Sequence, residues 1–164
     1  MHNRVVVVNS TPIIALASIQ RLDLFKALYE VTYIPKAVFD EVMIKDNSQA
    51  QLELVKAREW IITKSISNNE AKKFFKVQLH EGEVEVMILG LEISADLLVI
   101  DDYMAREYAK YLDFKVTGSL GVLLRAKEKG IIPKIKPLMN DFIENGIYIS
   151  DKLYYDILEI AEED

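Results

Sequence analysis

The sequence contains no cysteine, only two histidines and no long apolar run. Without cysteine the chain can form no disulfide, no thiolate metal site and no cysteine nucleophile. The histidines, His2 and His80, are too far apart to give a zinc-binding spacing. No apolar run reaches the roughly 18 residues that a membrane span needs, and the N-terminus shows no signal-peptide pattern. A cytoplasmic protein without a membrane partner is therefore expected.

Several motifs of phosphate and hydrolase chemistry are also missing. The chain has no Walker A loop and no Gly-x-Gly-x-x-Gly sequence. No serine triad can be assembled, because neither histidine lies near a predicted strand end. A receiver domain needs a pair of acids after its first strand, and here that position is Val8-Asn9. These absences exclude the common phosphate-binding loops and nucleophilic triads.

Charge is unevenly distributed along the chain, whose formal net charge is −6. This overall charge argues against a general nucleic-acid binder. Residues 105–137, however, contain eight Lys or Arg against three acids, whereas residues 138–164 contain eight acids and one base. The basic stretch is able to hold a polyanion such as RNA. Lysines on an ordinary solvated helix face would give the same count, so both interpretations stay open.

Short apolar strands alternate with helix-like segments along most of the chain. Buried strands are predicted at 4–8, 31–34, 97–100 and 114–117, with edge strands at 60–66 and 147–149. Helical segments are predicted at 13–19, 21–29, 35–42, 46–59, 67–78, 82–93, 103–112, 119–129, 133–145 and after Ser150. Parallel strands need such crossovers, so we predict a three-layer α/β/α sandwich with a central, mostly parallel sheet. We expect one domain, 1–164, in which residues 138–164 form an acidic C-terminal helical extension.

Two adjacent carboxylates, Asp101 and Asp102, follow the apolar run at 97–100. They stand at the carboxyl end of a strand, where open α/β sheets place their ligands. Neighbouring anions repel each other and lose hydration unless a cation offsets them. The pair is therefore a candidate site for a divalent metal ion. The alternative is that one of the two only caps the next helix, since Asp is a preferred N-cap residue.

Three further side chains with oxygen donors are expected near this strand end. Asn9 follows the first strand, and residues 10–11 are predicted to cap a helix that has Pro12 in its first position. Glu41 and Glu83 lie on predicted helices, where an exposed surface position or a favourable helix-dipole interaction would also explain them. Oxygen-only ligands suit Mg²⁺ or Mn²⁺, and such an ion would serve phosphodiester hydrolysis.

Five segments together resemble the PIN-domain family, in particular a prokaryotic branch of predicted nucleic-acid-binding proteins. Their order and spacing cover most of the chain, up to about residue 137. The segments are Val7–Leu16, Ile34–Val42, Gly82–Glu85, Leu98–Asp102 and Thr117–Leu123. The resemblance implies an α/β/α sandwich and ribonuclease activity that depends on Mg²⁺ or Mn²⁺. It also implies, for many members, a role as the toxin of a toxin–antitoxin pair.

The resemblance further implies roles for individual residues. Asn9, Glu41 and Glu83 take the first three acidic positions of the family's site, and the Asp101-Asp102 pair takes the fourth. Within the pair, the position of the strand end favours Asp102 as the family's fourth acid, and Asp101 stays an alternative. The implied metal ligands are Asn9, Glu41 and one or both of these aspartates. The wider family usually has Asp at the first position, so Asn9 keeps an oxygen ligand but removes one negative charge.

The basic stretch supplies the predicted contacts to the RNA backbone. These residues are Arg106, Lys110, Arg125 and Lys127, together with Ser119. The main hypothesis is a Mg²⁺- or Mn²⁺-dependent ribonuclease of toxin–antitoxin type, with RNA as substrate, an antitoxin-like protein as partner and homodimerisation left open. One alternative is a PIN-like module whose degraded site only binds RNA or protein. Another is a non-enzymatic subunit whose acidic tail docks a basic peptide.

Overall fold

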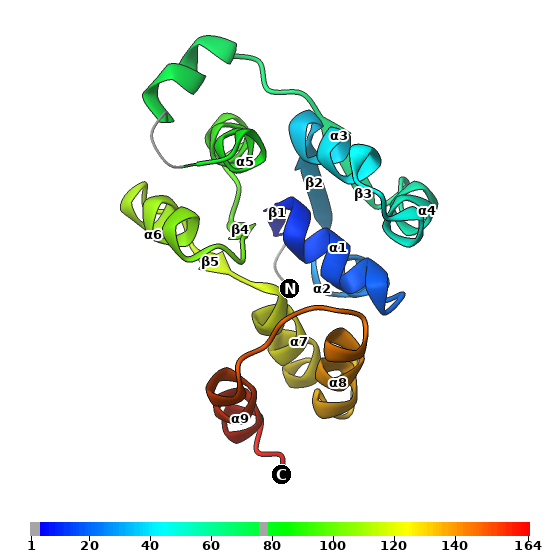
Figure 1. Cartoon of the computed structure of the whole chain (residues 1–164). Coiled ribbons are helices and arrows are strands. Elements are labelled where there is room, and N and C mark those ends of the chain that lie inside the picture. Colours follow the sequence, from blue (N-terminus) through cyan, green and yellow to red (C-terminus); the bar gives the residue numbers. More distant parts are fainter. Residues whose placement is uncertain (1–3, 76–78) are drawn as a thin grey trace.

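A five-stranded parallel sheet forms the centre of the computed structural model, which describes residues 4–75 and 79–164 (Figure 1). The strands are β1 Val5–Val8, β2 Val31–Pro35, β3 Ile61–Lys64, β4 Leu97–Val99 and β5 Val116–Thr117. They are ordered β3-β2-β1-β4-β5, and every pairing is parallel. The chain builds outward from β1 first on one side and then on the other, so the topological switch point lies between β1 and β4.

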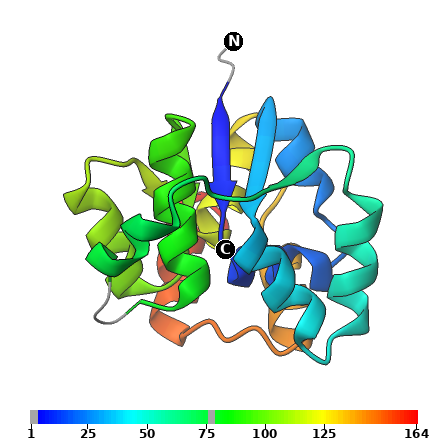
Figure 2. The same ribbon diagram turned by 90° about the horizontal axis from the view of Figure 1, so that it is seen from above.

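Helices cover both sides of the sheet and confirm the predicted sandwich. They are α1 Ser10–Ser18, α2 Asp23–Leu28, α3 Lys36–Ile44, α4 Ser48–Lys56, the 3₁₀ helix η1 Asn69–Phe75, α5 Glu81–Glu92, α6 Tyr103–Tyr111, α7 Ser119–Glu128, α8 Lys136–Glu144 and α9 Asp151–Ile160. Seen from above, α3 and α4 gather on one side of β1, and α5 and α6 on the other (Figure 2). Helices α8 and α9 lie beside α7, at the end of the molecule that holds the C-terminus (Figure 1).

The core explains why the inner strands have such continuous apolar sequences. Val6, Val7 and Val8 of β1 are fully buried, and so are Leu98 and Val99 of β4. A strand covered by helices on both faces needs apolar side chains at every position, not at alternate ones. Burying each such side chain stabilises the fold by roughly 1.5–3 kcal/mol, which makes the centre of the sheet a firm support for the residues that follow it.

Some local predictions differ from the structure. Helix α1 begins at Ser10 with Asn9 as its N-cap, so the predicted cap at residues 10–11 is wrong. Pro12 is tolerated there because the N–H groups of the first helical turn have no partner within the helix. No strand forms at 147–149, because in the described residues this segment pairs with neither edge of the sheet, β3 or β5. The helix predicted at 67–78 is a shorter 3₁₀ helix, and residues 76–78 of that prediction lie outside the described residues.

Other predictions are confirmed. Strand β3 lies at the edge of the sheet, and the Ser150 hydroxyl caps α9 by accepting a 3.1 Å hydrogen bond from the Leu153 N–H. Helix α7 ends close to Gly130, whose φ of +76° places it in the left-handed region that favours glycine. None of the helices in residues 4–75 and 79–164 combines the length and apolar character that a membrane crossing requires.

Candidate metal and nucleic-acid site

Asn9 lies at the switch point of the sheet, buried and without a partner for its side-chain oxygen. Val8 pairs with Val99, and the Asn9 N–H donates a 2.9 Å hydrogen bond to the Val99 carbonyl, which joins the carboxyl ends of β1 and β4. The Asn9 side chain makes no capping bond to α1, and its Oδ1 accepts no hydrogen bond from any described residue. Leaving a buried polar atom unpaired costs about 1–3 kcal/mol, so this oxygen is suited to a ligand.

The absence of a side chain on Gly82 lets oxygens of Asn9 and Glu41 lie close to the same point. A Cβ atom on Gly82 would stand 3.0 Å from Glu41 Oε1 and 3.5 Å from Asn9 Oδ1. The two oxygens therefore border the same small volume over the first turn of α5. The other oxygen of Glu41, Oε2, forms an ion pair of 3.1 Å with Lys45 one turn further along α3. A larger residue at position 82 would fill the space that these oxygens face.

Glu83 is the second acid at this place, and it is almost fully buried. Its Oε1 accepts a 3.0 Å hydrogen bond from the His80 N–H at the start of α5. Burial raises the pKa of Glu83, the His80 hydrogen bond opposes this rise, and the negative charges of Asp102 and Glu41 add to it. Three carboxylates thus act on one another here, and a bound cation would offset their repulsion.

The two aspartates after β4 have different partners. Asp101 accepts hydrogen bonds from the Ser119 N–H at 2.7 Å and from the Ser119 hydroxyl at 2.6 Å, so both of its oxygens hold the start of α7. Asp102 is the N-cap of α6, where its Oδ2 accepts a 2.9 Å hydrogen bond from the Ala105 N–H. The capping alternative is thus observed for Asp102, but the cap engages only one of its two oxygens.

Arg106 is a predicted RNA contact whose guanidinium lies beside Asp101. A Cβ atom on Gly118 would stand 2.6 Å from Asp101 Oδ1 and 2.7 Å from Arg106 Nη1, so the guanidinium and the carboxylate border one point. Lys110 lies one turn further along α6, where it forms a 3.0 Å ion pair with Glu107 on the exposed surface. Ser119, by contrast, is buried and donates its hydroxyl to Asp101.

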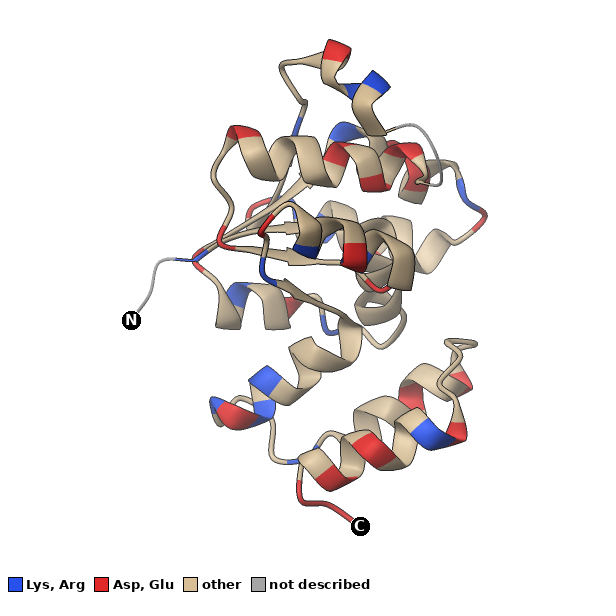
Figure 3. Cartoon of the chain, turned by 90° about the vertical axis from the view of Figure 1, so that its left-hand side faces the viewer, with Lys and Arg blue, Asp and Glu red and all other residues tan. Residues whose placement is uncertain are grey.

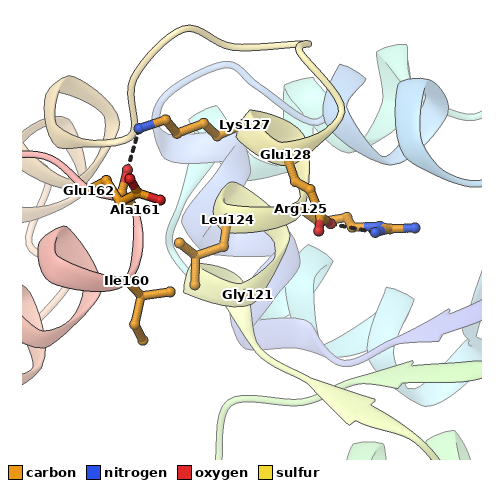
Figure 4. A pocket seen from close by; sticks show the side chains of 8 residues that line it. All are labelled: Gly121, Leu124, Arg125, Lys127, Glu128, Ile160, Ala161 and Glu162. Atoms are coloured by element: carbon orange, nitrogen blue, oxygen red, sulfur yellow. Dashed lines mark hydrogen bonds and ion pairs between the residues drawn. The ribbon is translucent and has the colours of Figure 1, made fainter.

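We call the place bordered by Asn9, Glu41, Glu83 and Asp102 the crevice. The structure places Arg125 and Lys127 away from it. At 1.5 Å per residue they lie roughly 9–12 Å along α7 from Ser119. Arg125 pairs with Glu128 of its own helix, while Lys127 donates to the Ala161 carbonyl and to Glu163. Both line a pocket of about 520 Å³ between α7 and the end of α9 (Figure 4). Their present partners belong to these helices and the C-terminus, not to the aspartates.

A second buried glutamate of α5 was not predicted as important. Glu85 is 6% exposed; it accepts a 3.1 Å hydrogen bond from the Ala37 N–H and forms a 2.8 Å ion pair with Lys72. It thereby connects α5 to both α3 and η1. The sequence contains a hint of this role, because three glutamates crowd the first turns of α5, more than a helix dipole alone explains.

No group of three or more His, Cys, Asp or Glu side chains within residues 4–75 and 79–164 is arranged to hold a metal ion. Asn9 is not one of these residue types. Its unpaired side-chain oxygen is therefore a further metal-donor atom that such a group does not include. The oxygens of Asn9, Glu41, Glu83 and Asp102 form a set of hard donors, which is the chemistry that Mg²⁺ and Mn²⁺ prefer. In chemical type the donor set therefore fits such an ion, although its acids do not form a closed metal site within the described residues.

Comparisons with known proteins identify the family of this chain. No curated protein matches the chain. Seven solved chains match it, among them a domain of a functionally unknown protein from Methanocaldococcus jannaschii DSM 2661, which is 16% identical. That alignment covers 70% of this chain and 90% of the other, with a TM-score of 0.49. A family model described as a PIN domain matches residues 5–163, nearly the whole sequence, and the chain therefore belongs to the PIN-domain family.

Proposed function

We propose that this protein is a Mg²⁺- or Mn²⁺-dependent ribonuclease. The observation that carries the proposal is the buried, unpaired Oδ1 of Asn9, which shares the space over Gly82 with Glu41. This place lies at the switch point of a parallel sheet, where α/β proteins bind their ligands. Membership of the PIN family supports nuclease-like chemistry in general terms.

The residues of the site divide into metal ligands, a proton carrier and a positioning residue. We assign Asn9, Glu41 and Asp102 as the ligands, since each has an oxygen that is not committed to a backbone hydrogen bond. A bound divalent ion would activate water and neutralise charge that develops on the phosphate. Glu83, with its raised pKa, is suited to move a proton at this site. Asp101 fixes the start of α7 through Ser119 and so positions its neighbour Asp102.

RNA would approach over α6 in this proposal. Arg106 and Lys110 are the phosphate contacts that we retain, because they follow Asp102 on the same helix. Arg125 and Lys127 would first have to leave Glu128 and Glu163. The same proposal includes a toxin role, an antitoxin-like partner and homodimerisation. It also includes the acidic extension 138–164 as part of a single domain. A small antitoxin-like reading frame beside the gene would support the toxin role.

A second candidate function is a PIN-like module that binds RNA or protein without cleaving RNA. Two features favour it. The site has Asn9 where the family usually has an acid, and the Lys45 ammonium already neutralises Glu41. Both features reduce the negative charge that attracts a divalent cation. Binding of RNA without metal-dependent cleavage would support this candidate.

Metal binding and RNA cleavage together separate these functions. The parent protein, Asp102→Asn and the control Glu107→Gln would be melted with and without Mn²⁺ and incubated with single-stranded RNA. Asn keeps the helix cap but removes the ligand charge at position 102, whereas Glu107 is exposed on the same helix. We expect Mn²⁺ to stabilise the parent and the control, and both to cleave RNA. Equal behaviour of all three proteins, or cleavage in excess chelator, would contradict the proposal.

A further inference from the structure

A pocket of about 610 Å³ opens directly beside the crevice and shares Glu41 and Gly82 with it. It lies between α3 and the first turn of α5. Its remaining walls are Ala37, Asp40, Ile44, Lys45, His80 and Glu81. Because Asn9 Oδ1 stands 3.5 Å from the Cβ position of Gly82, the buried, unpaired oxygen borders the same place. A molecule in this pocket would therefore touch the crevice.

The walls of the pocket combine flat or apolar surfaces with hydrogen-bond acceptors. Ile44, a large apolar side chain, is 82% exposed, and His80 lines the pocket from the start of α5. Three carboxylates, those of Asp40, Glu41 and Glu81, line the same cavity. They pair at the surface with Lys36, Lys45 and Lys72 in that order, and a ligand can displace such exposed partners. Such carboxylates repel phosphate, but they accept hydrogen bonds from neutral N–H groups. The pocket thus suits a flat, neutral ring whose edge carries N–H donors.

We propose that this pocket binds the nucleobase of the RNA nucleotide next to the phosphate in the crevice, and that it prefers guanine. This inference rests on the proposed ribonuclease function. Guanine presents its N1–H and N2–H groups side by side, so that one carboxylate accepts both in a bidentate pair. Uracil offers one N–H between two carbonyl oxygens, and these oxygens would face the carboxylates. Guanine is therefore the best match and uracil the worst.

Lys45 stands at the border between the pocket and the crevice. Its ammonium pairs with Glu41 at 3.1 Å, and its side chain is 53% exposed. An exposed ion pair of this kind contributes about 0–1 kcal/mol, so Lys45 can exchange Glu41 for a phosphate oxygen at small cost. A nucleotide would thus bind with its base in the pocket, its phosphate at Lys45 and the adjoining phosphate in the crevice.

Nucleotide binding tests this inference separately from RNA cleavage. Dissociation constants of GMP, AMP, CMP and UMP would be measured calorimetrically for the parent, Ile44→Ser and the control Ile143→Ser, an exposed isoleucine of α8. Ile44→Ser removes apolar surface that would cover the base, and losing buried apolar area weakens binding. We expect GMP to bind most tightly and UMP least, and Ile44→Ser to weaken GMP binding about fivefold or more while the control does not.

The possible failures of the two proposals differ. UMP binding as tight as GMP, or GMP binding equally to all three proteins, would overturn the nucleobase pocket, even if RNA cleavage requires Mn²⁺. Tight and selective GMP binding by a protein that neither responds to Mn²⁺ nor cleaves RNA would support the pocket and overturn the ribonuclease. The base preference of RNA cleavage gives a further check. If Ile44→Ser cleaves RNA with the same base preference as the parent, the pocket proposal fails and the ribonuclease proposal stands.

Discussion

At the scale of single residues, Asn9 decides how strongly the site attracts a cation. Its buried oxygen has no described partner, and an Asp here would place a full charge beside Glu41 and Glu83. We predict that Asn9→Asp destabilises the metal-free protein, because like charges repel. Excess Mn²⁺ should then raise its melting temperature more than that of the parent, since a ligand of the native state stabilises by mass action. Melting curves that Mn²⁺ shifts in neither protein would remove position 9 from the ligands.

Glu83 gives the second prediction at this scale, and it concerns pH. Its folded-state pKa is raised, mainly by burial, so its contribution to stability is present below its unfolded pKa of about 4.3 and is lost as the pH rises through the folded value. Gln at this position still accepts the His80 hydrogen bond but carries no charge. We predict that Glu83→Gln is more stable than the parent at pH 7, with the difference vanishing near pH 3.5. Urea unfolding at several pH values measures this, and a variant that is less stable at pH 7 would contradict it.

At the scale of elements, the first turn of α5 is the part on which the crevice depends. Gly82→Ala adds one methyl group that would stand 3.0 Å from Glu41 Oε1, the end of a flexible side chain. Alanine favours a helix over glycine by about 0.8–1 kcal/mol, so the substitution should leave stability unchanged or slightly higher. Because the methyl group fills the proposed site, we predict that the response to Mn²⁺ is lost. Calorimetric titration with Mn²⁺ checks this; a variant that binds the ion like the parent would place the site elsewhere.

Local sequence predicts an element well where that element's burial alone determines it. The valines of β1 and the apolar run of β4 are such cases, because strands covered on both faces need continuous apolar sequence. The predicted strand at 147–149 fails for the opposite reason, since a strand exists only where another edge receives it. Among the proposed site residues, Asn9 and Asp102 are predicted from their places after strands, whereas Glu41 and Glu83 are predicted from the resemblance to the PIN family. The space over Gly82 and the Ser119 hydrogen bonds to Asp101 depend on packing between distant segments, and no local pattern contains them.

At the scale of the whole molecule, one buried carboxylate adds polar contacts to the apolar packing that holds the acidic C-terminal segment. Figure 3 shows acidic positions, in red, along the ribbon of the C-terminal helices α8 and α9. Glu163 accepts hydrogen bonds from the Ile135 and Lys136 N–H groups and pairs with Lys127 at 2.9 Å, so one side chain joins the C-terminus to α7 and α8. Lys127 thus has a structural task in this fold.

Glu163→Ala should therefore destabilise the protein by about 1–3 kcal/mol, whereas the exposed neighbour Glu162→Ala should change stability by less than about 0.5 kcal/mol. Burial alone would raise the pKa of Glu163, but the hydrogen bonds from Ile135, Lys127 and Lys136 outweigh it and lower the pKa. Its stabilising contribution is consequently complete above the unfolded pKa of about 4.3 and is lost as the pH falls through the lower folded value. Denaturation of both variants at pH 7 and at pH 3 would check this; equal losses at pH 7 would contradict it.

The central claim is that the oxygens at the switch point hold a divalent ion. The most direct measurement is a titration of the ¹⁵N-labelled protein with Mn²⁺, because this ion broadens the NMR signals of amides near it. The account predicts that the amides of Asn9, Gly82 and Asp102 broaden first, at concentrations that leave the acidic residues 159–164 unaffected. Broadening that begins at residues 159–164, or that spreads over all acidic surfaces alike, would contradict it.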